Sequence, residues 1–358
     1  MTEEEPDMFR KAKAMEFPRE VVAGHGVIND IGPMARRFGF GKTAMIVTGK
    51  YTSKLAGEPV AHVLEDSGFN VVIVETGEAT VENLQSLKED AAEISPSFIL
   101  GVGGGSKIDL AKMASVHLNV PFISVPTSAA HDGIASPRAS IKNANGSSSL
   151  EARVPFAVVA DTGIIVKAPH RFLASGCADV ISNETALLDW ELAHRLRNEE
   201  ISTSSYTLAK YSSGFIINHA EEIKPNLEES VWRVIKPIII SGIAMGVAGS
   251  TRPASGSEHM FSHALDMIAP GRALHGEQCG VGAIMMMYLH GGDWRRIRRA
   301  LKIIGAPTTA SELGVTEEQV VEALTMAHTI RPERYTILGD SGIAREAAEN
   351  LARTTGVI

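Results

Sequence analysis

The chain has 358 residues, of which 44% are hydrophobic and 21% charged, which is typical of a globular protein large enough for two cores. Its net charge of −8 argues against a general nucleic-acid binder, because phosphate contacts need a basic face. The acidic start TEEE lacks an apolar signal core, so we expect a cytoplasmic protein. The longest apolar run, residues 238–249, is too short to span a bilayer and predicts a buried helix rather than membrane insertion.

Short β-branched runs alternate with helical stretches in the first half of the chain. Strands are predicted over residues 20–23, 43–48, 70–75, 97–102, 121–125 and 156–160. Helices are predicted over residues 28–38, 53–67 and 81–94. This alternation predicts an α/β fold with a mostly parallel, Rossmann-like sheet that is covered on both faces and binds ligands at the carboxyl ends of its strands.

Residues 140–150 depart from this alternation, and their Asn145-Gly146 pair predicts a β-hairpin. Beyond residue 169 the apolar spacing becomes helical, over residues 172–194, 204–220, 231–248, 275–289 and 315–327. We therefore predict an α/β domain at 1–165 and an all-helical domain at 166–358. The cleft between two such domains is the expected ligand site.

Three histidines lie close together in the helical half. His259 and His263 are four residues apart, so on a helix they project from one face. A Pro-Gly pair then ends that helix, and His275 begins the next one. Two helix faces that meet at a turn can direct imidazoles at one divalent metal ion. The spacing alone is also compatible with ordinary surface or buried histidines.

A glycine run follows the strand predicted at 97–102, in the sequence FILGVGGGSKIDLAK. Gly103, Gly104 and Gly105 let the backbone approach a ligand closely, and Ser106 can cap the helix that follows. The free N–H groups of such a helix start suit a pyrophosphate. The run is neither the Rossmann fingerprint nor a Walker loop, so a simple tight turn is the alternative.

GVGGGSKIDLAK resembles the GGGS-x-x-D-x-A-K signature of the family that unites iron-containing alcohol dehydrogenases, glycerol dehydrogenases, dehydroquinate synthases and glycerol-1-phosphate dehydrogenases. The resemblance covers nearly the whole chain. It implies a dehydroquinate synthase-like fold, with a dinucleotide-binding domain, a helical metal and substrate domain, and a metal in the cleft. The implied cofactor contacts in this motif are Gly103, Gly104, Gly105, Ser106, Lys107, Ile108 and Asp109.

The resemblance also implies a metal-ligand set. Asp179 matches the acidic residue that such proteins carry early in the helical domain, so Asp179, His259 and His275 are the implied ligands. Iron-dependent members have a further histidine where this chain has Asn183, so the site looks like the three-ligand type that holds one Zn²⁺ per subunit. The two cysteines leave a zinc–thiolate site as the alternative, although no Cys-x-x-Cys pair occurs.

Three motifs, PTSAAHDGIAS, SGSEHMFSHALD and HGEQCGVG, look most like the glycerol-1-phosphate dehydrogenase members. These members reversibly reduce dihydroxyacetone phosphate to sn-glycerol 1-phosphate with NAD(P)H, which supplies the backbone of archaeal ether phospholipids. The resemblance implies that Asp132 and His263 are catalytic and contact the substrate, which Asp179 also contacts. The implied nicotinamide contacts are Thr127, Ser128, Ala129, Ala130 and Ser136.

Three alternative functions remain. Glycerol dehydrogenase is the nearest, and one assay of substrate preference separates it. Dehydroquinate synthases carry Glu at position 179 with cations around it, which the local sequence ADVISNE lacks. A non-catalytic nucleotide or metal sensor would have lost a metal ligand or the glycine loop.

Two further features bear on the ligands. Gly49-Lys50 stands where iron-type relatives often carry the Asp that binds the adenosine ribose, so we expect use of NADP as well as NAD. Arg252 and Arg272 flank the metal segment and are candidates for the substrate phosphate. Because relatives assemble as dimers or larger rings, we expect a homo-oligomer, either a dimer or an octamer.

Overall fold

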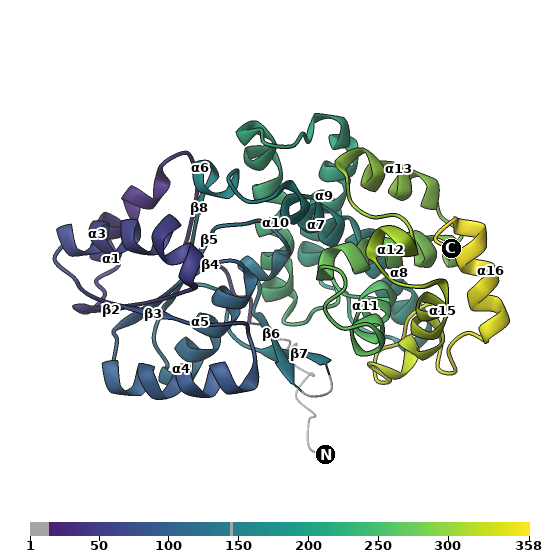
Figure 1. Cartoon of the computed structure of the whole chain (residues 1–358). Coiled ribbons are helices and arrows are strands. Elements are labelled where there is room, and N and C mark those ends of the chain that lie inside the picture. The colour runs from purple at the N-terminus through teal and green to yellow at the C-terminus, as the bar shows by residue number, and fades with distance from the viewer. Residues whose placement is uncertain (1–13, 144–145) are drawn as a thin grey trace, which may run out of the picture.

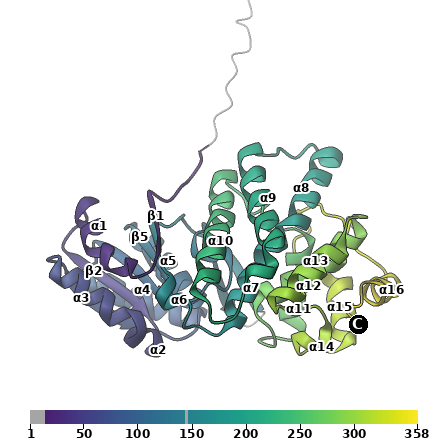
Figure 2. The ribbon, with the colours of Figure 1, turned by 90° about the horizontal axis from the view of Figure 1, so that it is seen from above.

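The computed structural model describes residues 14–143 and 146–358. It confirms the predicted fold class, with an α/β half that contains the sheet and a helical half beside it (Figure 1). Seen from above, helices from the middle of the chain separate the sheet from the C-terminal helices (Figure 2). The division of domains at residue 165 stays a prediction, and Asn145 of the predicted hairpin turn lies outside the described residues.

Six strands form the sheet of the α/β half, and all neighbouring pairs in it are parallel. In spatial order they are β1 (Glu20–Gly24), β8 (Ala157–Asp161), β5 (Phe122–Pro126), β4 (Phe98–Gly103), β2 (Thr43–Thr48) and β3 (Asn70–Glu75). The predicted strand bounds agree to within one residue, because buried β-branched runs leave few other choices.

Helices cover both faces of this sheet (Figure 1). Ala44 and Ile46 of β2 pack in one core with α1 (Ile31–Arg37) and α3 (Glu58–Asp66). Met45 and Val47 face the opposite core, which holds α4 (Val81–Ile94) and α5 (Gly105–Leu118). The alternation follows from the two-residue period of a strand, and burial on both faces explains why β2 reads as a continuous apolar run.

Shorter elements complete this half. The helix predicted at 28–38 begins as the 3-10 helix η1 (Val27–Asp30). The helix predicted at 53–67 consists of α2 (Lys50–Thr52), the π-helical turn η2 (Ser53–Gly57) and α3. Between β5 and β8 in the chain lie η3 (Asp132–Ile134) and the predicted hairpin, β6 (Arg138–Asn143) with β7 (Gly146–Glu151). The short helix α6 (Thr162–Ile165) follows β8.

The rest of the described chain is helical. Its elements are α7 (His170–Ile181), α8 (Asn183–Arg197), α9 (Thr203–Asn218), η4 (Ala220–Glu222), α10 (Glu228–Ala248), α11 (Ser257–Ile268), α12 (His275–Leu289), α13 (Trp294–Ile304), α14 (Ala310–Leu313), α15 (Glu317–Met326), η5 (Ala327–Thr329) and α16 (Arg345–Thr355). The helical spacing predicted over 172–194 corresponds to α7 and α8, which meet at Ser182. Helical bonds continue across this residue, because its N–H donates to the carbonyl of Ala178 and its own carbonyl accepts from the Ala186 N–H. The Ser182 hydroxyl also donates to the carbonyl of Asp179.

Helix α10 is long and apolar enough to cross a membrane by length and composition alone. In the structure, 72% of its most apolar window is buried inside the protein. Ile235, Ile238 and Ile239 pack into the main hydrophobic core, and the helix contacts both α9 and η3. The buried helix predicted from residues 238–249 is therefore confirmed.

Candidate metal and cofactor site

The three predicted metal ligands converge although they come from three helices. One oxygen of Asp179, on α7, lies 3.7 Å from Nε2 of His259 on α11 and 3.7 Å from Nε2 of His275 on α12. Together with the buried thiol of Cys279, their ligand atoms all lie within 4.8 Å of one another. Metal–ligand bonds of about 2.0–2.1 Å in a tetrahedral site place ligand atoms about 3.3 Å apart. These donors therefore fit a divalent cation. We call Asp179, His259 and His275 the metal set.

The other ring nitrogens of both histidines are already engaged. Nδ1 of His259 lies 2.9 Å from Oε1 of Glu258, and Nδ1 of His275 lies 3.2 Å from the hydroxyl of Ser262. Such partners fix the ring orientation and the tautomer, which leaves each Nε2 as an acceptor toward a cation. Burial lowers the pKa of both imidazoles, so they are neutral and ready to bind a metal.

Close helix packing brings these residues together. At Gly276, next to His275, a Cβ atom would lie 2.0 Å from the carbonyl oxygen of Ser175, so only glycine lets α12 pass this close to α7. Glu277 then fixes the start of α12, because it accepts from the Leu274 N–H at 2.8 Å and pairs with Arg171. His275 is thereby held at the first position of the helix.

Asp132 lies on η3 beside the metal set and ties it to the α/β half. Its backbone N–H donates to Oδ2 of Asp179 at 2.9 Å, and its own carboxylate accepts from Ser241 at 2.7 Å. Burial, then the neighbouring Asp179 carboxylate, raises the pKa of Asp132 to about 8. Burial also raises the pKa of Asp179 to about 7. Without a cation, two buried acids this close do not both carry a negative charge at neutral pH.

His263 is one turn from His259 on the same face of α11, as predicted. Its ring lies 5.8 Å from that of His275, and it lines the cleft rather than joining the metal set. Its buried Nδ1 has no hydrogen-bond partner among the described residues. An unpaired buried nitrogen in a cleft favours contact with a bound ligand.

The glycine loop has the predicted place but differs in detail. Helix α5 begins at Gly105 with Gly104 as its N-cap, so Ser106 lies inside the first turn and is not the cap. Asp109 lies beyond the first turn, buried, where it accepts from the Ser140 N–H at 3.0 Å. Lys112 is also buried and donates to the carbonyls of Gly133 and Arg138.

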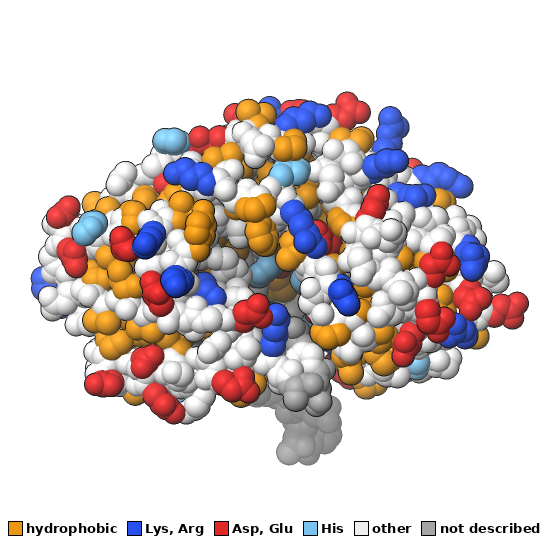
Figure 3. Space-filling view, viewed as in Figure 1, with side chains coloured by type: hydrophobic (Ala, Val, Ile, Leu, Met, Phe, Trp, Pro, Cys, Tyr) orange, Lys and Arg blue, Asp and Glu red, His pale blue; other side chains and the backbone are white. Residues whose placement is uncertain are grey.

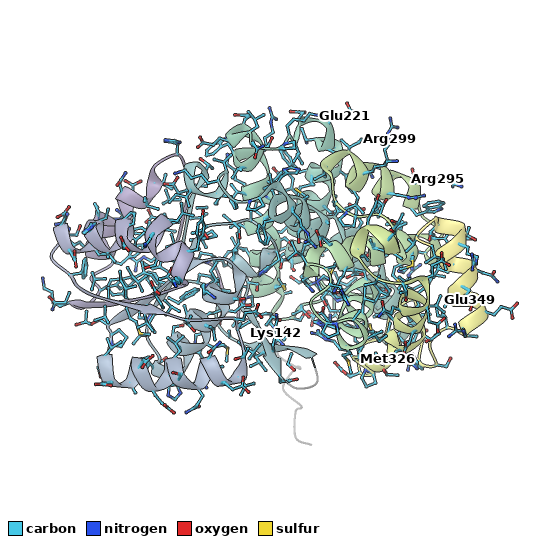
Figure 4. All side chains as sticks on the ribbon, viewed as in Figure 1. Lys142, Glu221, Arg295, Arg299, Met326 and Glu349 are labelled. Carbon is cyan, nitrogen blue, oxygen red and sulfur yellow. The ribbon has the colours of Figure 1, made fainter. Side chains whose placement is uncertain are left out.

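A cleft of about 1010 Å³ joins the glycine loop to the metal set. In the space-filling view the molecule is hollowed between its two halves, and histidine, Lys and Arg side chains border the hollow (Figure 3). Lys142 of β6, labelled in Figure 4, lines the cleft and pairs with Glu78 of the α/β half at 2.6 Å. Asp132, His259, His263 and His275 also line this cleft. Volumes of this order hold a cofactor together with a small substrate.

The predicted cofactor residues divide into two groups. Gly105, Ser106, Asp109 and Ser136 line the cleft, whereas the others are not among the residues that line it. The residues outside the lining are Gly103, Gly104, Lys107, Ile108, Thr127, Ser128, Ala129 and Ala130. The Thr127 N–H donates to the carbonyl of Gly103 at 2.9 Å, so the ends of β4 and β5 support each other.

Comparisons with known proteins decide the family. The family model described as iron-containing alcohol dehydrogenase matches residues 22–169. The glycerol-1-phosphate dehydrogenase [NAD(P)+] of Methanosarcina barkeri is 56% identical over 347 residues, which is 97% of both chains. That of Methanothermobacter thermautotrophicus is also 56% identical, over 97% of this chain and 99% of its own. This chain belongs to the glycerol-1-phosphate dehydrogenase family.

Solved structures support the fold independently. Glycerol dehydrogenase from Schizosaccharomyces pombe superposes with a TM-score of 0.81 at 20% identity, over 96% of this chain and 90% of that one. An iron-containing alcohol dehydrogenase from Thermotoga maritima has a TM-score of 0.72 at 18% identity, over 96% and 99%. At such identities the likeness concerns the fold alone.

Two residues of the site were missed from the sequence. His131 lies in the cleft wall with its Nε2 against the glycine loop, where a Cβ on Gly105 would come within 2.1 Å of it. Burial lowers its pKa to about 3, so the ring is neutral. Glu258, which orients His259, is the other. Both stand beside predicted residues, in PTSAAHDGIAS and SGSEHMFSHALD, and that adjacency was the available signal.

Proposed function

We propose that this chain catalyses the reversible NAD(P)H-dependent reduction of dihydroxyacetone phosphate to sn-glycerol 1-phosphate, and so supplies the backbone of archaeal ether phospholipids. The observation that carries the proposal is the convergence of Asp179, His259 and His275 on a cleft whose other wall is the glycine loop. In a member of this family, that arrangement brings a cation and a dinucleotide to the same small volume.

Asp179, His259 and His275 would hold one Zn²⁺ per subunit, with Cys279 as a neighbour of His275 at 3.6 Å. When bound, the ion supplies a Lewis acid that polarises a carbonyl and stabilises negative charge on its oxygen. One carboxylate and two neutral imidazoles leave such a site with a net charge of about +1. A carboxylate and imidazoles suit zinc and other divalent ions alike, so metal analysis of the purified protein tests the identity.

Asp132 and His263 would bind the substrate hydroxyls, and Asp179 would touch the substrate beside the metal. Asp132 has its pKa raised to about 8, so it can hold or release a proton near neutral pH. His263 offers an unpaired buried nitrogen on the same side of the cleft. The pair would keep a proton close to the substrate oxygen that is being reduced or oxidised.

The glycine loop, from Gly103 to Asp109, would hold the pyrophosphate at the start of α5, where free N–H groups favour negative charge. Ser136 and the segment from Thr127 to Ala130 would support the nicotinamide. Lys50, an exposed residue that follows the end of β2, would attract the 2′-phosphate of NADP and so allow use of both cofactors. We further propose a cytoplasmic homo-oligomer, a dimer or an octamer, in which residues 1–165 and 166–358 are the two domains.

The decisive experiment follows NADH and NADPH absorbance with dihydroxyacetone phosphate and, separately, with unphosphorylated dihydroxyacetone. We expect kcat/KM to favour the phosphorylated ketone by about 100-fold or more, because a site built for a charged group rejects an analogue that lacks it. Chiral analysis of the product should give sn-glycerol 1-phosphate. Preference for dihydroxyacetone would make the chain a glycerol dehydrogenase and overturn the proposal.

A further inference from the structure

Two arginines without a carboxylate partner lie beside the metal set. Arg331 and Arg334 follow η5 in the irregular segment before α16, and Arg331 lines the cleft. Among the described residues, no carboxylate forms a salt bridge with either guanidinium. Both side chains are partly buried, and a cation held away from water is normally paired, because its removal from water is costly. Two neighbouring unpaired cations therefore indicate an anion that binds from outside the chain.

The hydroxyl of Thr251 lies between these two arginines. It accepts from Nη1 of Arg331 at 3.2 Å and from Nη2 of Arg334 at 2.7 Å. Both bonds use the oxygen as an acceptor, so the hydroxyl hydrogen remains available to donate. Arg331 uses only this one of its five N–H groups within the described chain. Thr251 and Arg331 both line the cleft, so the unused donors are available to a ligand there.

The other nearby cations are occupied by the protein. Arg334 donates a second bond to the carbonyl of Ser255 at 2.5 Å, which fixes it behind Thr251. Arg138, across the cleft on β6, donates to the carbonyl oxygen and hydroxyl of Ser149. Arg138 and Arg331 both line the cleft, so both guanidiniums border the same volume.

The arginines also lie close to the metal set. Arg331 lines the same cleft as His259 and His263, and Arg334 donates to the carbonyl of Ser255, four residues before His259. An anion at Arg331 would thus sit beside His263, on the helical wall of the cleft. The glycine loop lies on the opposite wall, so this anion is not the pyrophosphate of the dinucleotide.

We propose that Arg331, with the hydroxyl of Thr251, binds the phosphate group of the substrate. This subsite rests on the proposed function and names the residues that separate a phosphorylated ketone from an unphosphorylated one. A guanidinium suits this task, because its planar N–H groups can bond two phosphate oxygens at once. Arg334 supports Thr251 from behind, and Arg138 adds positive potential from across the cleft.

The two arginines predicted from the sequence do not fill this role. Arg252 is buried and pairs with both carboxylate oxygens of Glu199, and it also donates to the carbonyl of Tyr335. Arg272 is exposed and does not line the cleft, although its neighbours Gly271 and Ala273 do. Arg272 is therefore the matched control for Arg331.

The test compares Arg331→Gln with Arg272→Gln, each assayed with dihydroxyacetone phosphate and with dihydroxyacetone. For Arg331→Gln we expect kcat/KM with the phosphorylated substrate to fall about 10- to 100-fold, the range for loss of a hydrogen bond to a charged group. The rate with dihydroxyacetone should change less than about twofold, because that substrate never reaches the guanidinium. Competitive inhibition by inorganic phosphate should weaken in parallel, and Arg272→Gln should match the parent protein in all three assays.

An equal loss with both ketones in Arg331→Gln, or unchanged inhibition by inorganic phosphate, would overturn the subsite. If Arg331→Gln does not fold, Thr251→Val gives an independent measurement, with a selective loss expected for the phosphorylated substrate alone. The substrate preference of the parent protein tests the proposed function separately. A parent that prefers dihydroxyacetone refutes the proposed function, whereas one that prefers the phosphorylated ketone keeps that function even if Arg331 proves irrelevant.

Discussion

The backbone N–H of Asp132 donates to the side chain of Asp179 at 2.9 Å, and this bond joins η3 of the α/β half to the three predicted metal ligands of the helical half. The other oxygen of Asp179 is the one near both histidine Nε2 atoms. One carboxylate can therefore offer one oxygen to a cation while the other holds η3 in place. If Asp179 binds a cation as proposed, cation binding and the position of η3 are coupled through this residue.

Asp179→Asn should abolish tight metal binding and lower kcat/KM by at least about 1,000-fold, since the negative ligand is lost and the Lewis acid with it. An amide oxygen can still accept the Asp132 N–H, so the fold should persist. Atomic emission measures the loss of metal, and far-UV circular dichroism checks that the fold persists. Activity close to that of the parent in a metal-depleted Asp179→Asn protein would contradict the site.

Metal affinity should fall as the pH is lowered. Burial raises the pKa of Asp179 to about 7, and a cation binds only the ionised form, so binding releases its proton. The histidines add little to this release, because burial already lowers their pKa values. Between pH 7 and pH 6 the ionised fraction falls from about one half to about one eleventh, so the apparent Kd for Zn²⁺ should rise about fivefold. Titration calorimetry in buffers of different ionisation enthalpy measures the release, and a pH-independent Kd would contradict it.

Glu258→Gln should weaken metal affinity about 10- to 100-fold, the usual effect of removing a carboxylate that orients a ligating histidine. Glu258 accepts from the Gly256 N–H at 2.6 Å and from Thr185 at 2.9 Å, besides its contact with His259. Glu184→Gln is the matched control, because Glu184 is equally a buried glutamate but pairs with Lys210. Equal metal affinity in both variants would assign Glu258 a purely structural part.

Asp132→Asn should lower kcat about 100- to 10,000-fold while the metal stays bound, because general acid–base catalysis contributes a factor of that size. The bond from its backbone to Asp179 does not depend on the side chain. Parallel measurement of kcat and metal content separates proton transfer from metal loss. If the variant loses its metal, Asp132 belongs to the support of the cation instead.

Lys112→Met should destabilise the protein by about 3–5 kcal/mol, because it leaves the buried Asp109 carboxylate without the cation 3.7 Å away. It also removes donors from the carbonyls of Gly133 and Arg138. Urea unfolding at fixed protein and metal concentration measures the change. The double variant Lys112→Met with Asp109→Asn should recover part of the loss, and simple additivity of the two changes would refute the pairing.

Much of the fold could be predicted because local patterns and burial agree. The strand at Thr43–Thr48 and the helices at Val81–Ile94 and His275–Leu289 have the predicted bounds. The boundary between α7 and α8 at Ser182 could not be predicted, since the apolar spacing continues across it. Helix α13 was missed although its apolar residues face the core.

The site shows the same division. Asp179, His259 and His275 could be named because a family motif surrounds each one, and the structure brings them together as expected. Arg331 carried no such signal, because it lies in an irregular segment far along the chain from the other site residues. We infer a ligand at Arg331 because no carboxylate of the described residues pairs with it, and this can be seen only in the folded chain.

The two charged residues of the glycine-loop signature have a consequence for how this scaffold diversifies. Oδ2 of Asp109 accepts from Ser140 of β6, and Lys112 donates to the carbonyls of Gly133 and Arg138, so both residues hold the β6 hairpin and the Asp132 turn to α5. These two residues of the signature thus stabilise the fold and do not select the substrate. Substitutions among the other residues that line the cleft can therefore change which alcohol is bound while the signature stays the same.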